Sequence, residues 1–448
     1  MADPATPPGW RLAALGLLAG GIALGARAAA SGAWRPLGLG LAAWLAASVG
    51  PIVVASRRPP IPPRPADWTP APDRTTFSVI VAARDEASVI GDIVRDVAAQ
   101  DHRDATGDPC FELVVVDDRS VDGTAGVARE AAEAAGIGDL TRVVRRDGAN
   151  LPDGKGAALT AAPPETCAGD VIVVLDADAR IGPRFLSTLA WYVERGAGAV
   201  TARRRISHTG TSALALAQAD EQTADGEIQR GRWSLGGCSE FRGNGIVVRH
   251  DLLADVGGWR ADALTEDLDL SSRLAAHRGV TVAWAIDAEV WEEPVDEWRW
   301  LWRQRIRWAE GAVRRLFEHG PAVARSPHLS PAARADFAGY AAQLLAPPLA
   351  VGFGLGSIVA RDLRPAFVVA GIYGAAGTIL AWDALRWERD ASGGPLGPGV
   401  RVGRAARAAG FGTIWIAAVP AALWRLVTRR GRVRYDKMAH RGGGEAAP

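Results

Sequence analysis

The sequence predicts an α/β domain with a largely parallel sheet, placed between apolar segments that are long enough to span a membrane. Between residues 75 and 290, short apolar runs alternate with helix-like segments, and this βαβα order is typical of parallel sheets with right-handed connections. Long apolar segments precede and follow this region. The 17 tryptophans of the 448-residue chain also fit a protein that contacts a membrane interface.

Net charge and cysteine usage narrow the class of protein. The formal net charge is +1, so no long-range field favours nucleic acid as a partner. Cys110, Cys167 and Cys238 are widely spaced and form no CxxC pattern. A disulfide framework is therefore not expected, and a reducing, cytosolic setting is the simpler interpretation for the middle of the chain.

Two apolar segments near the start of the chain, residues 12–30 and 37–55, are each long enough to cross a hydrocarbon layer of roughly 30 Å. A signal peptide is the alternative for the first segment. It has no basic n-region beyond Arg11, however, and a second apolar segment follows at once. Three arginines follow the second segment in a proline-rich connector, so the positive-inside rule places the connector and the next domain in the cytosol.

Four apolar runs are expected to form the strands of the sheet: 77–83, 112–118, 141–144 and 171–175. The last run ends in Asp176-Ala177-Asp178, and alternation along a strand points both carboxylates to the same side. In an open α/β sheet the carboxyl edge is where ligands bind, and paired carboxylates suit Mg²⁺ or Mn²⁺. The triplet alone is a weak signal, because Asp267-Leu268-Asp269 repeats its spacing.

Residues 291–317 predict an arginine-rich helix with a tryptophan-rich apolar side, which we expect to lie in the membrane interface. Gln304, Arg307, Trp308 and Gly311 follow the spacing i, i+3, i+4 and i+7 and therefore share one face. That face is expected to line a catalytic pocket, while another face of the same helix contacts lipid.

Three further apolar segments follow, at residues 337–360, 366–385 and 408–427. The pair Pro347-Pro348 and Pro420 are expected to kink or break two of them, the first and the last. Three spans after a cytosolic domain would place the tail outside the cell, whereas the basic residues after position 428 favour the inside. A re-entrant segment, or a first segment that counts as two, would resolve this conflict.

The motifs, taken in chain order, resemble those of family 2 glycosyltransferases, which have the GT-A fold. They are Arg84-Asp85-Glu86, Asp117-Asp118-Arg119-Ser120-Val121-Asp122-Gly123-Thr124, Gly154-Lys155-Gly156, Asp176-Ala177-Asp178, Thr265-Glu266-Asp267 and Gln304-Arg305-Ile306-Arg307-Trp308. The last motif is typical of the membrane-embedded branch, which includes cellulose, hyaluronan and poly-N-acetylglucosamine synthases and glycolipid glucosyltransferases of the ceramide type. The resemblance implies a GT-A, Rossmann-like domain inserted between the N- and C-terminal transmembrane helices.

The resemblance also implies roles for the site residues. Asp267 would be the general base with Glu266 beside it, and Asp178 with Asp176 would hold Mg²⁺ or Mn²⁺. The residues that would bind the nucleotide or the substrate are Glu86, Asp118, Lys155, Asp176, Gln304, Arg305, Arg307 and Trp308.

The implied activity is inverting transfer of a sugar from a nucleoside diphosphate sugar, with a UDP-sugar as the first candidate, to a growing polysaccharide at the membrane. The alternative is a single addition to a membrane lipid. The implied setting is the inner (plasma) membrane, with several spans and a cytosolic catalytic domain. The acceptor is a carbohydrate or a lipid, and an accessory subunit is left open.

The sequence divides into six expected regions. They are 1–56 (transmembrane helices), 57–74 (linker), 75–290 (catalytic domain), 291–335 (interfacial helices), 336–428 (transmembrane helices) and 429–448 (basic tail). Two other classes of protein are alternatives. A nucleotidyltransferase would carry a glycine-rich loop after its first strand, and residues 82–86 contain no glycine. A non-catalytic scaffold would not be expected to retain both the acidic motifs and the Gln-x-x-Arg-Trp motif.

Overall fold

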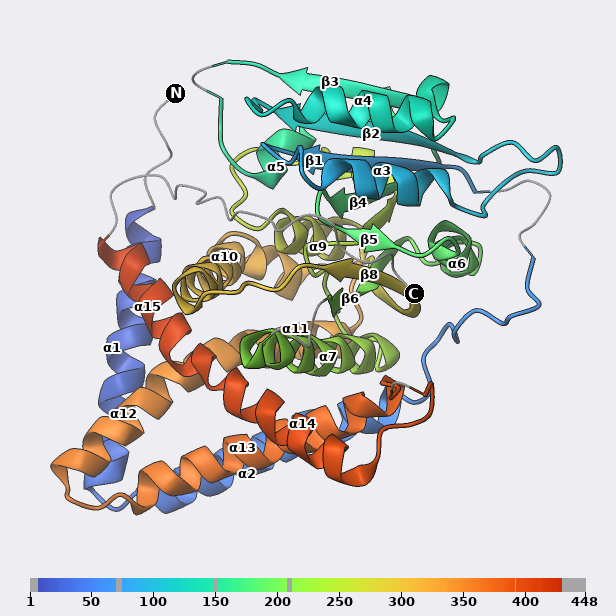
Figure 1. The fold of residues 1–448 in the computed structure, drawn as a ribbon. Helices are drawn as coiled ribbons and strands as arrows, with labels where there is room; N and C mark the ends of the chain where they lie inside the picture. The colour runs from blue at the N-terminus through green and yellow to red at the C-terminus, as the bar shows by residue number, and fades with distance from the viewer. Residues whose placement is uncertain (1–6, 70–74, 149–150, 208–211, 391, 429–448) are drawn as a thin grey trace.

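The computed structural model places an α/β domain against a set of long helices that come from both ends of the chain (Figure 1). The residues that the structure describes are 7–69, 75–148, 151–207, 212–390 and 392–428. Within them, 5 helical segments are long and apolar enough to cross a membrane, judged by length and composition.

The α/β domain contains one eight-stranded sheet in the described residues, with the strand order β3-β2-β1-β4-β7-β6-β8-β5. The strands are β1 (Phe77–Ala83), β2 (Phe111–Asp118), β3 (Thr141–Arg146), β4 (Val171–Asp176), β5 (Arg180–Ile181), β6 (Ala199–Ile206), β7 (Ile246–Arg249) and β8 (Ala283–Glu292). All four strands expected from the sequence are confirmed, and the third extends two residues further.

The sheet is largely parallel, as expected: within the described residues only β7 and β5 run against the other six strands. Strands β1, β2, β3 and β4 pair in parallel, and so do β6 and β8, whereas β7 is antiparallel to both β4 and β6, and β5 is antiparallel to β8. The reversal begins at Gly245, whose amide donates to the carbonyl of Val174 (3.1 Å). Strand β7 therefore starts beside the carboxyl end of β4 and runs back along it.

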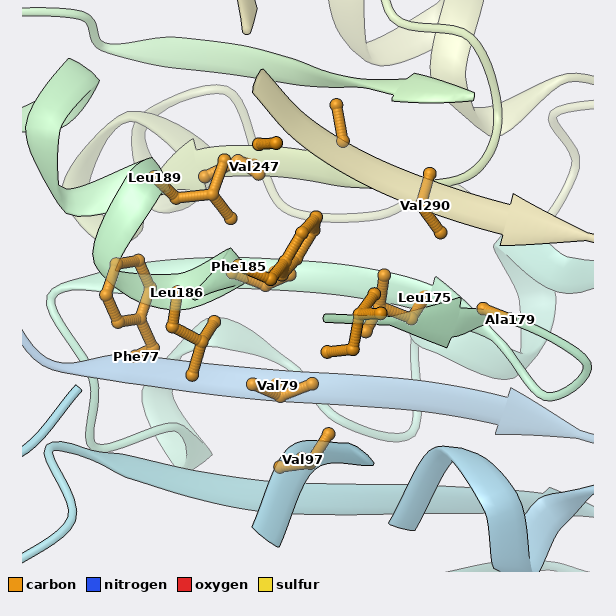
Figure 2. Packing of buried hydrophobic residues seen from close by; sticks show 14 of the residues in the cluster. Phe77, Val79, Val97, Leu175, Ala179, Phe185, Leu186, Leu189, Val247 and Val290 are labelled. Atoms are coloured by element: carbon orange, nitrogen blue, oxygen red, sulfur yellow. The ribbon is translucent and has the colours of Figure 1, made fainter. Parts of the chain in front are cut away.

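Both faces of the half of the sheet formed by β1, β2, β3 and β4 are buried, which explains why these strands are continuous apolar runs. One face packs on α3 (Ile90–Ala98), α4 (Thr124–Ala134) and α6 (Phe185–Val193), as Figure 2 shows for Val79, Leu175 and Phe185. The other face packs on α5 (Lys155–Leu159), α8 (His250–Asp255) and α9 (Glu266–Arg278). Each aliphatic side chain that is fully buried in these layers stabilises the fold by roughly 1.5–3 kcal/mol.

The remaining helices form two groups that meet near residues 31–33 and 360–363 and diverge from there (Figure 1). The first helix group contains α1 (Pro8–Ala30), α12 (Ala346–Val359) and α15 (Ile414–Thr428). The second helix group contains α2 (Trp34–Ala55), α13 (Arg364–Ala384) and α14 (Pro398–Gly412). Helix α10 (Trp298–Arg325) lies against the first group, and α7 (Ala213–Ser234) lies against the second.

The predicted apolar segments all form helices, with one break near Pro347 and a second at Thr413, whereas Pro420 lies inside the continuous helix α15. Residues 337–360 divide into α11 (Pro331–Ala342) and α12, separated by a 3₁₀ turn at Gln343–Leu345. Pro347 and Pro348 then occupy the first turn of α12, where a missing amide costs no helical hydrogen bond. The basic tail 429–448 lies outside the described residues.

Much of the apolar stripe of α10 contacts protein, whereas Trp298 at its start is exposed. Ile306, Ala309 and Val313 are buried against Ala14 of α1 and Leu423 of α15. An apolar helix and a lipid tail offer the same kind of surface, so the sequence pattern fitted both.

Helix α14 attaches the second helix group to the α/β domain through charge. The buried carboxylate of Asp220 on α7 accepts hydrogen bonds from Arg404 (2.6 Å) and Arg407 (2.7 Å) of α14. This helix therefore begins before the predicted segment 408–427, and its first half lies on the domain. A buried carboxylate shared by two guanidinium groups keeps the two parts in one fixed arrangement.

Candidate active site

The carboxyl ends of β1, β2 and β4 open into a cavity of about 1080 Å³. Every site residue predicted from the sequence lines this cavity except Arg305. The lining residues among them are Glu86, Asp118, Lys155, Asp176, Asp178, Glu266, Asp267, Gln304, Arg307 and Trp308. The structure thus brings together acids from three strands, the start of α9 and one face of α10.

The loops after β1 and β2 hold Glu86 at the edge of the cavity. The hydroxyl of Ser120 accepts a hydrogen bond from the amide of Asp85 (2.8 Å), and that of Thr124 accepts one from the amide of Glu86 (2.8 Å). In return, Asp85 accepts from the amide of Val121 (2.8 Å). Because the two loops share these bonds, the acids that follow neighbouring strands are fixed relative to each other.

Asp118 is held by two arginines at the end of β2. Arg146 donates to its Oδ1 atom at 2.8 Å, and Arg119 donates to the same atom at 2.9 Å. The carboxylate is nearly buried, and paired charges of this kind need good geometry to offset their desolvation. Asp118 is therefore a rigid acceptor at the rim of the cavity.

Lys155 stands between the acid pair of β4 and the start of α9. Its ammonium group donates to Asp176 and to the carbonyl of Gly243 (2.8 Å), and it lies 4.0 Å from a carboxylate oxygen of Glu266. Burial acts to lower the pKa of Lys155, but the carboxylates of Asp176 and Glu266 outweigh it and raise the pKa. Lys155 is therefore a permanent cation that links two groups of acids.

Glu266 and Asp267 occupy the first turn of α9, where the free backbone amides favour negative charge. Burial raises the pKa of Glu266 to about 7, and Lys155 acts against this rise. Burial also raises the pKa of Asp267, and Arg242 is among the groups that oppose it. A carboxylate with a raised pKa is a stronger base, which suits proton transfer from a hydroxyl.

Arg242 is a cavity residue to which the sequence analysis gave no role. It forms two hydrogen bonds to Asp225 (2.6 and 3.2 Å) and one to the hydroxyl of Tyr340 (2.9 Å). The adjacent Gly243 has a φ of +81°, which turns the chain so that its Cα faces Asp267. The only available signal was the position of Arg242 beside the glycines of Gly243-Asn244-Gly245.

We expect Arg242 to set the pH at which Asp267 works. Because a general base must be ionised, the acid limb of kcat/KM follows the pKa of Asp267. Arg242→Gln removes a positive charge, so the pKa of Asp267 rises and the acid limb moves to higher pH. Arg242→Lys keeps the charge and should return the limb towards its wild-type position. A pH–rate profile in which Arg242→Gln leaves the limb in place would contradict this role.

The face of α10 that carries the Gln-x-x-Arg-Trp motif divides between the cavity and the protein interior. Gln304, Arg307 and Trp308 line the cavity. Arg305 does not; it is buried, pairs with Glu221 of α7, and lies 4.3 Å from the ring centroid of Trp308. The structure therefore places Arg305 where it supports Trp308 from behind.

Gly311 sets the distance between α10 and the acids of α9. A Cβ atom at this position would lie 2.3 Å from the Cγ2 atom of Thr265, the residue before Glu266. Because Gly311 has no side chain, α10 can approach α9 closely, and Arg307 and Asp267 then line the same cavity.

Gly311→Ala should therefore push α10 away from α9. We expect turnover to fall by roughly 10²-fold, the effect of a misplacement near 1 Å, and the free energy of unfolding to fall by about 1–3 kcal/mol from overpacking. Gly320→Ala on the same helix is the matched control, because no atom lies within 4 Å of its Cβ position. Equal activity and equal thermal inactivation in the two variants would show that the close contact has no role.

Two groups of acids in the described residues invite comparison as metal sites. Asp176 and Asp178 both line the cavity and offer the hard oxygen ligands that Mg²⁺ and Mn²⁺ prefer. Asp269, Glu318 and His319 also lie close together, but outside the cavity lining. Arg260 (3.2 Å) and Arg273 (2.8 Å) already neutralise Asp269, so the cavity pair is the better donor set.

Comparisons with known proteins agree on one family. Residues 72–311 match the family described as "Glycosyltransferase like family 2". A beta-monoglucosyldiacylglycerol synthase of Synechocystis sp. is 33% identical over 270 residues, which is 60% of this chain and 54% of that protein. A poly-beta-1,6-N-acetyl-D-glucosamine synthase of Staphylococcus aureus is 29% identical over 114 residues, which is 25% of this chain and 27% of that protein. The chain spans about half the length of the first of these curated relatives.

One solved structure extends the likeness to most of the chain. The mannosyltransferase PcManGT from Pyrobaculum calidifontis, in complex with GDP-Man and Mn²⁺, aligns with a TM-score of 0.52 at 22% identity. The alignment covers 90% of this chain and 98% of that one, so the fold includes the flanking helices.

Proposed function

Since the chain belongs to glycosyltransferase family 2 and has the GT-A fold, we propose that it transfers a sugar from a nucleoside diphosphate sugar to a hydroxyl acceptor at a membrane, with inversion at the anomeric carbon. The observation that carries the proposal is the convergence of Asp178, Asp267 and Arg307 on one cavity. The reaction needs positive charge beside the diphosphate and a base for the acceptor hydroxyl. Asp178 would hold a cation beside the diphosphate, Arg307 would add a second positive charge, and Asp267 would be the base.

The leaving diphosphate gains charge as the glycosidic bond breaks, so positive groups must face it. Arg307 and Arg204 both line the cavity, and a guanidinium group matches the geometry of phosphate oxygens. A divalent cation held by Asp178 and Asp176 would add further positive charge beside the phosphates. Relatives in the fold class have been solved with Mn²⁺, and Mn²⁺ or Mg²⁺ is the cation that we propose here.

Asp267 would take the proton of the acceptor hydroxyl as its oxygen attacks the anomeric carbon. Direct attack from the face opposite the diphosphate converts an α-linked donor into a β-linked product. Glu266, Glu86, Asp118 and Lys155 would position the donor from the other side of the cavity. The three carboxylates can accept hydrogen bonds from the hydroxyl and amide groups of a nucleoside.

Trp308 would stack on the acceptor sugar or glycerol backbone, whose C–H groups suit an aromatic face. The guanidinium groups of Arg204 (5.5 Å) and Arg305 (4.3 Å) lie near its ring centroid and limit how far it can turn. Gln304 on the same face of α10 would bind a hydroxyl of the acceptor. We further propose that the α/β domain lies on the cytosolic side of the inner membrane, as the arginines after α2 indicate.

The experiment that tests the proposal is a donor panel with the purified full chain in detergent. UDP- and GDP-sugars are supplied with Mg²⁺ or Mn²⁺ and extracted membrane lipids, and the released nucleotide is measured. Release of a nucleoside diphosphate from one donor supports the proposal. Release of pyrophosphate would indicate a nucleotidyltransferase, and no release from any donor would indicate a non-catalytic protein.

A further inference from the structure

The cavity that holds the catalytic residues continues into the space between the two helix groups. Leu45 and Val49 of α2, Gly374 of α13, Ala408 of α14 and Ile416 of α15 line the same cavity as Asp267. Helices α7 and α10 separate most of the α/β domain from these helices, and the cavity passes between them. A single space therefore joins the base to the centre of the helical region.

The part of the cavity within the helices has a mostly apolar lining, with Tyr373 and Thr413 among its few polar side chains. No Asp, Glu, Lys or Arg of α2, α13, α14 or α15 lines it among the described residues, and small residues such as Gly374 and Ala408 leave the space open. A sugar polymer carries several hydroxyl groups on each unit, and most of them would lose their water partners here, because the lining offers few hydrogen-bonding groups in exchange. Acyl chains carry no such groups and fit this lining.

The surroundings of the cavity also fit a lipid. The two helix groups diverge from the turns near residues 31–33 and 360–363 (Figure 1), and helices of both groups line the cavity. Only 6% of the most apolar 18-residue stretch of α2 is buried inside the protein. The outer side of a helix that lines the cavity is thus available to surrounding lipid.

We propose that the acceptor is a membrane lipid with a free hydroxyl group, and that its acyl chains occupy the space between the two helix groups while the hydroxyl reaches Asp267. This inference rests on the proposed sugar transfer and names its acceptor. It selects the single-addition alternative over polymer synthesis, because the lining offers a grown sugar chain few hydrogen-bonding groups.

Helix α13 provides a matched pair of substitutions for the test. The Cβ positions of Gly374 and Gly371 both meet no atom within 4 Å, so leucine can be introduced at either without a clash at that atom. Gly374 lines the cavity, whereas Gly371, about one turn earlier on the same helix, is exposed and does not line it. Gly374→Leu therefore fills the cavity, and Gly371→Leu controls for the change in helix propensity.

Binding is measured first, without turnover. The full chain in phosphatidylcholine nanodiscs is irradiated with a diazirine-labelled dioleoylglycerol, and labelled peptides are identified by mass spectrometry. We expect labels on α2, α13, α14 and α15 that unlabelled dioleoylglycerol displaces. The labelling should fall at least fivefold in Gly374→Leu and should not change in Gly371→Leu. Labels outside the cavity only, or equal labelling of the two variants, would overturn the proposal.

Turnover is measured second, with the donor that the panel selects. Gly374→Leu should raise the KM for dioleoylglycerol at least fivefold and leave the KM for the donor unchanged, and Gly371→Leu should behave as wild type. Long sugar chains formed without a lipid acceptor would overturn the inference while leaving sugar transfer intact. Displaceable labelling without any nucleotide release would support the lipid site and contradict the proposed function instead.

Discussion

Asp267→Asn should reduce turnover by roughly 10²–10⁴-fold, the usual contribution of a general base, while the protein stays folded and binds its donor. The amide has nearly the shape of the carboxylate but cannot accept the proton of the attacking hydroxyl. No compensating base is expected, because Glu266 beside it is turned towards Lys155, 4.0 Å away. The loss should appear in kcat rather than in the KM for the donor.

Asp262→Asn is the matched control for this variant. Asp262 lies five positions earlier, is exposed at the surface and pairs with Arg260 at 2.8 Å, outside the cavity lining. It should retain wild-type turnover. Nucleotide release measured for both variants at saturating donor decides the matter, and wild-type release by Asp267→Asn would remove the base from the mechanism.

Asp178→Asn should abolish most of the dependence on a divalent cation together with most of the activity. A carboxylate that holds the cation contributes several kcal/mol through the charge it positions, which corresponds to a loss of roughly 10²–10³-fold in rate. The apparent affinity for Mn²⁺ should also fall by about tenfold or more.

Mn²⁺ titration of nucleotide release measures both effects. Asp147→Asn is the control, because Asp147 is exposed, pairs with Arg145 at 2.9 Å and lies outside the cavity lining. Treatment of the wild-type protein with EDTA should reproduce the Asp178→Asn loss, and added Mn²⁺ or Mg²⁺ should reverse it. An Asp178→Asn variant with an unchanged Mn²⁺ titration would move the cation away from this acid pair.

The half of the sheet formed by β1–β4 was predictable because its apolar sequence pattern agrees with its burial in the folded protein. The run 171–175 is apolar on both faces and is buried on both faces, so the pattern alone defines the strand. Acids directly after such strands must meet at one edge, and Asp118, Asp176 and Asp178 do so. The motif order then extended the prediction to Asp267 and Arg307.

The other half of the sheet was not predictable for a physical reason. Strand β6 carries Arg203, Arg204 and Arg205, which no strand rule places in a sheet interior. Two of these arginines pair with Glu388, which lies more than 180 positions later in the chain. Their burial depends on that distant carboxylate, and a local pattern contains no information about it.

The cavity residues that sequence reasoning missed act through tertiary contacts. Arg242 matters because α9 and α11 bring Asp267 and Tyr340 beside it, and Arg305 points away from the cavity centre because it pairs with Glu221 of α7. The motif gave the residue types but not the direction in which each side chain points. The acceptor space had no sequence signal, since it is lined by small residues from four separate helices.

The most direct measurement of the central claim is the anomeric configuration of the first product, determined by NMR on material made from an α-linked nucleoside diphosphate sugar. If Asp267 activates the acceptor on the face of the sugar opposite the diphosphate, the product is β-linked. An α-linked product would require attack from the other face and would contradict the arrangement of Asp178, Asp267 and Arg307 described here.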